Sequence, residues 1–414
     1  MPAGLRALSL RDYRLYFSGT LVGQTGMWMQ SVTQSWLVLE LTGSPFKLGL
    51  ISTLQSGPIL LLSIFTGVLA DRVTRRTLLF VTQSGQACLA VTLGLLAWTG
   101  HARYWHVAVV AVLWGIMAAI DQPARQSMVM ELVGRQHVSS AVGLNSASFN
   151  GARIVGPALA GLLIARVGLS PGFLLNALAF AFSIAMLARI PGRRPAPREG
   201  EATFVDDMLE GVASALRTPS VRFILGVQII LSFCVFNFSV YVPLLARHVL
   251  GMGAEGFGLL MTCLGIGALI AGLSLGAIGA PRSTLIAAAL AVACGCLVGL
   301  GFTRVLWLAA LVLSLTGFSG TIVMAGCNTS LQLGAPDALR GRVMSLYTLL
   351  SGGIFPLGAF WIGFISEHWG VSRAFLVNGA IGLAAVGALL LWQRLRASAA
   401  DGGGFFVSAW RRRG

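Results

Sequence analysis

Charge is scarce in this sequence. Asp, Glu, Lys and Arg make up only 10% of its 414 residues, whereas a soluble domain carries about 25%. Hydrophobic residues account for 56% of the chain, and the mean hydropathy is +0.81. This composition excludes a soluble globular protein and a disordered one, and it indicates a chain that lies mostly in a lipid bilayer.

Lysine is nearly absent, since Lys47 stands alone against 28 arginines. The residues around it lack the glycine frame of a phosphate-binding loop of the G-x-x-x-x-G-K type, which excludes ATP hydrolysis by that route. All six cysteines lie inside apolar stretches, and Cys294 and Cys296 would project from two faces of a helix. We therefore expect no disulfide, no metal site and no cofactor.

Long apolar segments occupy most of the chain, and a membrane-spanning helix needs about 20 such residues. The segments lie at about 15–41, 46–70, 77–98, 105–125, 139–166, 170–190, 221–247, 256–279, 283–302, 305–330, 342–366 and 371–393. The pattern predicts an all-α membrane protein with twelve transmembrane helices.

The net charge of +15 comes from arginines in short runs between the apolar segments. They do not gather on one wet face, so we expect no nucleic acid partner. With the N-terminus inside, 22 basic residues fall on the inner side and six on the outer side, and Arg153 lies within a span. This bias predicts a multi-pass protein of a bacterial inner membrane with both termini in the cytoplasm.

The polar stretch at 191–220 divides the chain. Its prolines, arginines and acids predict a cytoplasmic linker, and the amphipathic piece from Val205 to Leu216 predicts a helix on the membrane surface. The expected parts are listed here: an N-terminal six-helix bundle at 1–190, the linker at 191–220, a C-terminal six-helix bundle at 221–395 and a basic cytoplasmic tail at 396–414.

The two halves share residues at a constant offset of 202. The pairs are Leu144 and Leu346, Gly156 and Gly358, Gly161 and Gly363, Gly168 and Gly370, Phe173 and Phe375, and Asn176 and Asn378. A single offset without gaps favours a duplication. Two parallel six-helix repeats with a site between them are a known transporter plan.

A charged motif follows the second span. It consists of Gly67, Asp71, Arg72, Arg75 and Arg76. A carboxylate beside three guanidiniums can hold helix ends together through charge-assisted hydrogen bonds. The spacing G-x-x-x-D-R-x-x-R-R resembles the signature of the major facilitator superfamily, although Thr74 stands where that signature usually has glycine. The resemblance implies the major facilitator fold and a cytoplasmic latch that favours the outward-facing state; the alternative is that the arginines only mark topology.

Asp121 lies near the inner end of the fourth span, about 6 Å from the boundary at Arg125. An acid inside a membrane is a functional candidate. The resemblance implies that Asp121 pairs with Arg75 or Arg76 in the latch. A role in carrying protons is the alternative.

The fifth span contains Gly156-Pro157 and Gly161, which predict a local break and a hinge in that helix. This run resembles the span-five signature of exporter branches of the superfamily and so implies export. The stretch from Asp121 to Gly161 resembles the enterobactin-exporter and macrolide-efflux group more specifically.

Arg153 would lie about 21 Å deep in the fifth span, where a guanidinium is costly unless it is paired or faces water. It is a candidate to hold an anionic group of a substrate. A buried structural pair, or contact with helix carbonyls, is the equal alternative.

Polar and aromatic side chains on several spans predict a substrate chamber. These candidates are Gln24, Trp28 and Gln34 on span one, Arg153 on span five, Asn237 on span seven and Asn328 on span ten. Each polar residue alone is more often an interhelical hydrogen bond. Together they favour a large, weakly polar substrate.

We therefore expect a monomeric secondary active transporter that exports a drug, siderophore or related small molecule. The sequence shows no carboxylate at mid-depth, and the arginine that proton antiporters of the superfamily carry in span four is Ala111 here, so proton coupling is implied by resemblance alone. The alternatives are an importer or lipid flippase of the same fold and, from other classes, a membrane-embedded enzyme, channel or receptor. An enzyme needs a catalytic set, and none of the five histidines pairs with an acid at catalytic spacing.

Overall fold

The computed structural model describes residues 3–191, 218–278, 281–334 and 340–401, with side chains throughout except at 3–4, 63–72, 135, 219, 276–278, 340–342 and 396–401. Every regular element in these ranges is a helix. The expected surface helix at 205–216 lies outside the described residues, as does the end of the tail beyond 401.

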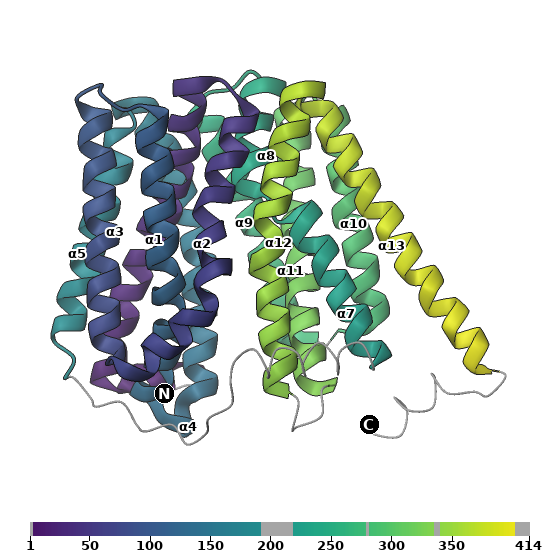
Figure 1. Ribbon diagram of the computed structural model, residues 1–414, viewed down its shortest axis with the longest axis horizontal. Coiled ribbons are helices and arrows are strands. Elements are labelled where there is room, and N and C mark those ends of the chain that lie inside the picture. The colour runs from purple at the N-terminus through teal and green to yellow at the C-terminus, as the bar shows by residue number, and fades with distance from the viewer. Residues whose placement is uncertain (1–2, 192–217, 279–280, 335–339, 402–414) are drawn as a thin grey trace.

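The first half begins with a short helical segment and continues in long helices (Figure 1). They are η1 (Ala3–Ser9), α1 (Arg11–Thr42), α2 (Pro45–Arg72), α3 (Arg75–Trp98), α4 (Tyr104–Val167) and α5 (Ser170–Ala188). Tight turns separate the long helices. The first turn uses Gly43, whose positive φ of 63° lets its N–H reach the carbonyl of Leu39 and end α1.

The second half starts with a rod of four short segments, in which Phe236 and Asn237 separate the second from the third. They are α7 (Pro219–Ile230), η2 (Leu231–Val235), α8 (Phe238–Leu244) and η3 (Leu245–Val249). Five long helices follow it. They are α9 (Ala254–Ile278), α10 (Ser283–Phe302), α11 (Leu306–Gly334), α12 (Arg340–Trp369) and α13 (Val371–Asp401).

Helix α4 contains two spans, because Gly134 breaks its helical geometry with φ 62° and ψ 178°. The spans are Tyr104–Gly134 and Gln136–Val167. Within the described ranges the helices therefore form twelve rods, and ten of them are long and apolar enough to cross a bilayer. Helices α1 and α2 are the two that fall outside this criterion, and α1 carries three glutamines in its middle. The predicted all-α, twelve-span fold is confirmed.

The rods are arranged in two bundles, one from each half of the chain (Figure 1). In the first bundle α1 packs against α4 and α5, and in the second α9 packs against α11 and α10 against α13. The bundles meet where α2 contacts α12 and where α4 contacts α9. Helix α1 begins and α13 ends at the same end of the molecule, as an even number of crossings requires (Figure 1).

Residues related by the offset of 202 occupy matching places in the two bundles. Gly168 and Gly370 both adopt positive φ, 100° and 85°, in the turn between the fifth and sixth rods of their bundle. Asn176 and Asn378 follow in the sixth rods and are each only 1% exposed. The structure therefore supports an internal duplication.

Candidate functional site

The two bundles approach each other closely at a pair of glycines on α4 and α9. A Cβ added to Gly161 would lie 3.0 Å from the Cα of Gly258. A second glycine pair joins α2 and α12, where a Cβ on Gly49 would lie 3.0 Å from the Cα of Gly363. Small residues allow helix backbones to approach in this way. Gly161 and Gly363 are partners at the offset of 202, so the two contacts are related by the internal symmetry.

Polar contacts reinforce the seam at the same end of the molecule. A carboxylate oxygen of Glu367, at the end of α12, accepts hydrogen bonds from Ser44 Oγ at 2.8 Å and from the backbone N–H of Phe46 at 3.1 Å. About two to three turns deeper, Thr53 Oγ1 donates to the carbonyl of Pro356 at 2.9 Å. With the orientation expected from the arginines, this closed end is the outer one.

The bundles separate toward the opposite end, where α1 begins and α13 ends (Figure 1). Among the described residues, the hydrogen bonds that cross the seam reach no deeper on α4 than Ile154, whose carbonyl accepts from Thr262 at 3.4 Å. In the orientation expected from the arginines, the two bundles are closed at the outer end and parted at the inner end, which is the inward-facing arrangement of a two-bundle fold.

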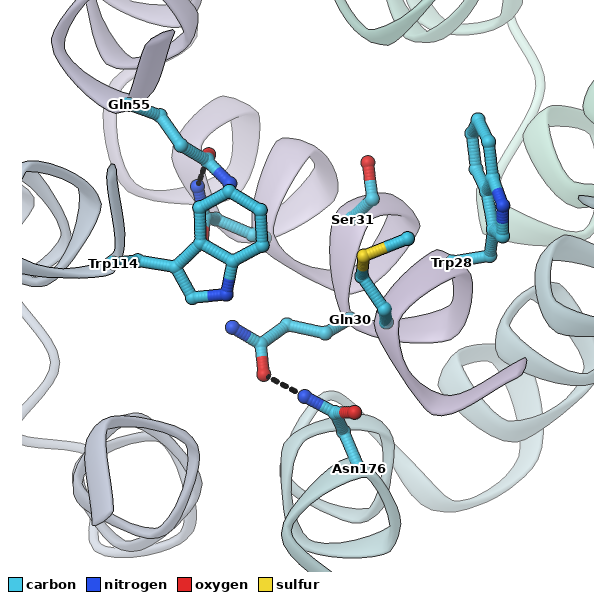
Figure 2. A pocket seen from close by; sticks show the side chains of 8 residues that line it. Trp28, Gln30, Ser31, Gln55, Trp114 and Asn176 are labelled. Carbon is cyan, nitrogen blue, oxygen red and sulfur yellow. Dashed lines mark hydrogen bonds between the residues drawn. The ribbon is translucent and has the colours of Figure 1, made fainter. Parts of the chain in front are cut away.

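A cavity of about 140 Å³ lies inside the first bundle (Figure 2). It is lined by Met27, Trp28, Gln30, Ser31 and Gln34 of α1, Gln55 of α2, Trp114 of α4 and Asn176 of α5. Two amide pairs hold its walls: Gln34 donates to Gln55 at 2.8 Å, and Asn176 donates to Gln30 at 2.5 Å (Figure 2). Its polar and aromatic lining can bind a partly polar organic group.

The structure places the predicted chamber residues of the first bundle in different positions. Trp28 and Gln34 line the cavity. Gln24 lies further along α1, where its side-chain oxygen accepts a hydrogen bond from Ser148 at 2.9 Å. Sequence reasoning missed Gln30, although it shares a helix face with Gln34 four residues on.

The predicted chamber residues of the second bundle make local contacts in this conformation. Asn237 is fully buried between η2 and α8, and its amide donates to the carbonyl of Phe233 at 2.8 Å. It satisfies backbone groups that the change from π to α geometry leaves free. Asn328 accepts a hydrogen bond from Gln332 at 2.6 Å along α11. Neither residue reaches the cavity of the first bundle.

Arg153 lies at the seam near the middle of the fifth span and is only 6% exposed. Its guanidinium carbon is 5.8 Å from the ring centre of Trp28 and 5.2 Å from that of Phe238 in the other bundle. Its Nε is buried without a hydrogen-bond partner, and the ion pairs among the described residues do not include it. The described part of the chain therefore shows no ion-pair partner for Arg153.

The motif after the second span is described only in part, because the side chains of Gly67, Asp71 and Arg72 lie outside the described residues. Arg75 Nη1 lies 3.4 Å from a carboxylate oxygen of Glu131. Arg76 donates to two carbonyls at the end of α5, those of Leu187 at 3.2 Å and Ala188 at 2.8 Å. The two arginines thus tie the start of α3 to α4 near its break at Gly134 and to the end of α5.

Asp121 does not pair with Arg75 or Arg76 as the resemblance implied. It forms an ion pair with Arg125, one turn further along α4, and accepts a hydrogen bond from Thr82 Oγ1 at 2.9 Å. Arg125 is the nearer partner because residues four apart share a helix face. Asp121 is 7% exposed, and because the helix continues to Gly134, this buried, paired acid lies near the middle of the fourth rod and not at its inner end as expected.

The helix is continuous at the glycine and proline residues of span five, where a break was expected. Gly134 carries the non-helical geometry of α4 instead. Gly156 is a contact point, since a Cβ there would lie 2.7 Å from Cβ of Trp28. The carbonyl of Pro157 would lie 2.7 Å from a Cβ on Gly258. These residues therefore serve close packing against α1 and α9 in this state.

Metal ligands do not cluster in the described part of the chain, where no group of three or more His, Cys, Asp or Glu is placed to hold an ion. The site offers amides, aromatic rings and one buried guanidinium. Such groups can bind an organic molecule through hydrogen bonds and ring contacts.

A profile of the family described as "transmembrane secretion effector" matches residues 3–403. The chain is also similar to the staphyloferrin A transporter of Staphylococcus aureus, with 25% identity over 88% of this chain and 92% of that one. The multidrug efflux pump Tap of Mycolicibacterium fortuitum is 26% identical over 87% of this chain and 91% of its own. The enterobactin exporter EntS of Shigella boydii is 24% identical over 92% of this chain and 91% of its own.

Solved structures with the same fold include a bacterial homologue of the human lysosomal transporter Spinster in an inward-facing and occupied conformation. Its TM-score is 0.72 at 14% identity, covering 93% of this chain and 97% of that one. A POT family transporter in complex with 5-aminolevulinic acid has a TM-score of 0.72 at 12% identity, covering 91% and 95%.

Proposed function

We propose that this chain, which belongs to the transmembrane secretion effector family of major facilitator transporters, exports a small organic compound from the cytoplasm across a bacterial inner membrane. The observation that carries the proposal is the symmetric seam, in which two glycine pairs close one end of two duplicated bundles. Such a seam forms and parts as a unit when one bundle rocks against the other.

Relatives support the direction of transport. One is named an efflux pump and another an exporter, and each aligns over about nine-tenths of its own length. Their names favour a drug or a siderophore as the class of compound carried here. The names of these relatives do not support import or lipid flipping. The family match is to transporters, so it does not support the enzyme alternative either.

The compound enters from the inner side in the state described and binds at the centre of the molecule. We assign its binding to the chamber residues predicted from the sequence: Gln24, Trp28, Gln34, Arg153, Asn237 and Asn328. Trp28 and Gln34 already line a cavity. That cavity, about 140 Å³, is smaller than the roughly 300–1,000 Å³ of a drug-sized site, so the bundles move when the compound binds.

The latch and the hinge act in the return to the outward-facing state. When the glycine seam opens, the inner ends of the bundles come together, and Asp71 and Arg72 end α2 where that contact is expected. Arg75, Arg76 and Asp121 already join α3, α4 and α5. Gly67, Gly156, Pro157 and Gly161 provide the close crossings along which the helices slide.

Protons supply the driving force in this proposal, and one chain is the functional unit because both halves of the seam belong to it. Asp121 is the buried acid of the described residues, and its protonation would break the ion pair with Arg125. The placement of both termini in the cytoplasm follows from the arginine bias.

An accumulation assay tests the proposal. A panel of drugs and siderophores is loaded into an efflux-deficient host that carries the wild type or Asp71→Asn, with and without a proton uncoupler. We expect at least one compound to accumulate less with the wild type, and both the variant and the uncoupler to remove the difference. Higher accumulation with the wild type would indicate import, and equal accumulation across the panel would contradict export.

A further inference from the structure

Two buried donors without acceptors lie beside each other at the middle of the seam. Arg153 Nε and Trp28 Nε1 both lack a hydrogen-bond partner. The guanidinium carbon lies 5.8 Å from the centre of the Trp28 ring, so the two side chains are in contact. Buried polar groups normally have hydrogen-bond partners. Two neighbouring buried donors without partners therefore point to a missing acceptor.

Arg153 takes part in none of the ion pairs between described residues. Asp121 pairs with Arg125, and Glu131 lies beside Arg75. Glu367 accepts hydrogen bonds at the outer end of the seam. The ring faces of Trp28 and Phe238 offset part of the cost of burying the positive charge of Arg153.

The environment around Arg153 suits a planar anion. Trp28 supplies one aromatic face and Phe238 another, so a flat group that enters here meets rings on the way to the guanidinium. The guanidinium presents a rigid fork of donors that matches the two oxygens of a carboxylate. Trp28 also lines the amide cavity, which places that cavity next to the proposed anion site.

We propose that Arg153 and Trp28 bind the carboxylate of the exported compound, and that the substrates are aromatic or other planar organic acids. This inference rests on the export function proposed above and names its substrate class. Because Phe238 belongs to the other bundle, a carboxylate that draws the guanidinium away removes a contact across the seam. Binding of the acid thereby favours separation of the bundles.

Equilibrium binding to the purified full-length protein in detergent tests the inference. The probes are benzoate, naphthoate and indole acetate, each paired with its uncharged amide, and the readouts are tryptophan fluorescence and thermal stabilisation. We expect at least one acid to bind the wild type about tenfold or more tightly than its amide, the size of a charge-assisted hydrogen bond. Arg153→Gln should bind acid and amide equally, and Arg153→Lys should keep a reduced preference.

Arg247→Gln is the matched control, because Arg247 also lies over a tryptophan, 5.8 Å from the ring centre of Trp36. It should keep the preference of the wild type. The inference is overturned if the wild type binds none of the acids, if it binds acids and amides alike, or if folded Arg153→Gln still prefers the acid.

The outcome is separable from that of the export proposal. Acid binding that depends on Arg153, without export in cells, would contradict the transport direction and keep the site. Export of compounds without a preference for acids would contradict the proposed carboxylate site and keep the proposed export function.

Discussion

Gly161 and Gly258 face each other across the seam so closely that a Cβ on either residue would lie within about 3 Å of the other's Cα, at 3.0 and 2.9 Å. They come from different bundles, α4 and α9. No side chain larger than hydrogen fits there without moving a backbone. The closed outer end of the carrier therefore depends on the absence of side chains at these two positions.

Gly161→Leu should hold the outer end open. Overpacking of a close contact costs about 1–3 kcal/mol, which shifts a two-state equilibrium by roughly 5- to 150-fold. We expect export to fall at least about fivefold with unchanged amounts of protein in the membrane. Gly143→Leu is the control on the same helix, because a Cβ at Gly143 meets nothing within 4 Å. Equal losses in the two variants would show that the seam is not the cause.

Asp121→Asn should destabilise the protein by leaving Arg125, whose side chain is 22% exposed, without its counter-ion. Breaking a fully buried pair costs about 3–5 kcal/mol, and we expect a smaller cost here, measured as a fall in the melting temperature of the purified protein. Asp121→Asn combined with Arg125→Gln should lose less than the sum of the single variants. Additive losses would mean that the two side chains do not interact.

Glu367→Gln should weaken only moderately the hydrogen bonds that Glu367 accepts from Ser44 and Phe46 across the outer seam. Glu367 is exposed, and hydrogen bonds and ion pairs at exposed sites contribute about 0.2–1 kcal/mol. A labelling reagent that does not cross the membrane should therefore react up to about fivefold faster with a cysteine placed at Ser35, which lies in the seam. Glu255→Gln, an acid at the outer end of α9, should leave the labelling rate unchanged.

The symmetry-related asparagines should separate a binding role from a packing role. Asn176→Leu removes the partner of Gln30 in the cavity wall and should change the order in which compounds are exported. Asn378→Leu removes a hydrogen bond to the carbonyl of Cys234, outside the cavity, and should lower stability without changing that order. Competition among several exported compounds provides the measurement, and identical profiles for the two variants would contradict the assignment.

The spans could be predicted from the sequence because about 20 consecutive apolar residues have one stable solution in a bilayer. The segment at 283–302 coincides with α10. The fourth span was predicted to end at 125, whereas the helix continues to Gly134. Charge at Arg125 does not stop a helix, while the positive φ of a glycine does.

The candidate site could be predicted only in part, since side-chain partners depend on packing. The ion pair of Asp121 with Arg125 has the four-residue spacing of a helix face and was visible in the sequence. The family resemblance favoured Arg75 or Arg76 instead, which proved wrong in this conformation. The local role of Asn237 follows from a π-to-α transition that apolar periodicity does not reveal.

Transport into inside-out membrane vesicles tests the central claim most directly. Ser44→Cys and Glu367→Cys replace two residues that hydrogen-bond across the outer seam, in a chain whose native cysteines are replaced, so that a short thiol cross-linker that a reductant can cleave locks the seam. The account predicts uptake of an exported compound before cross-linking, loss of uptake after cross-linking and recovery with a reductant. Uptake that continues through the locked seam, or that occurs only in right-side-out vesicles, would contradict export by alternating access.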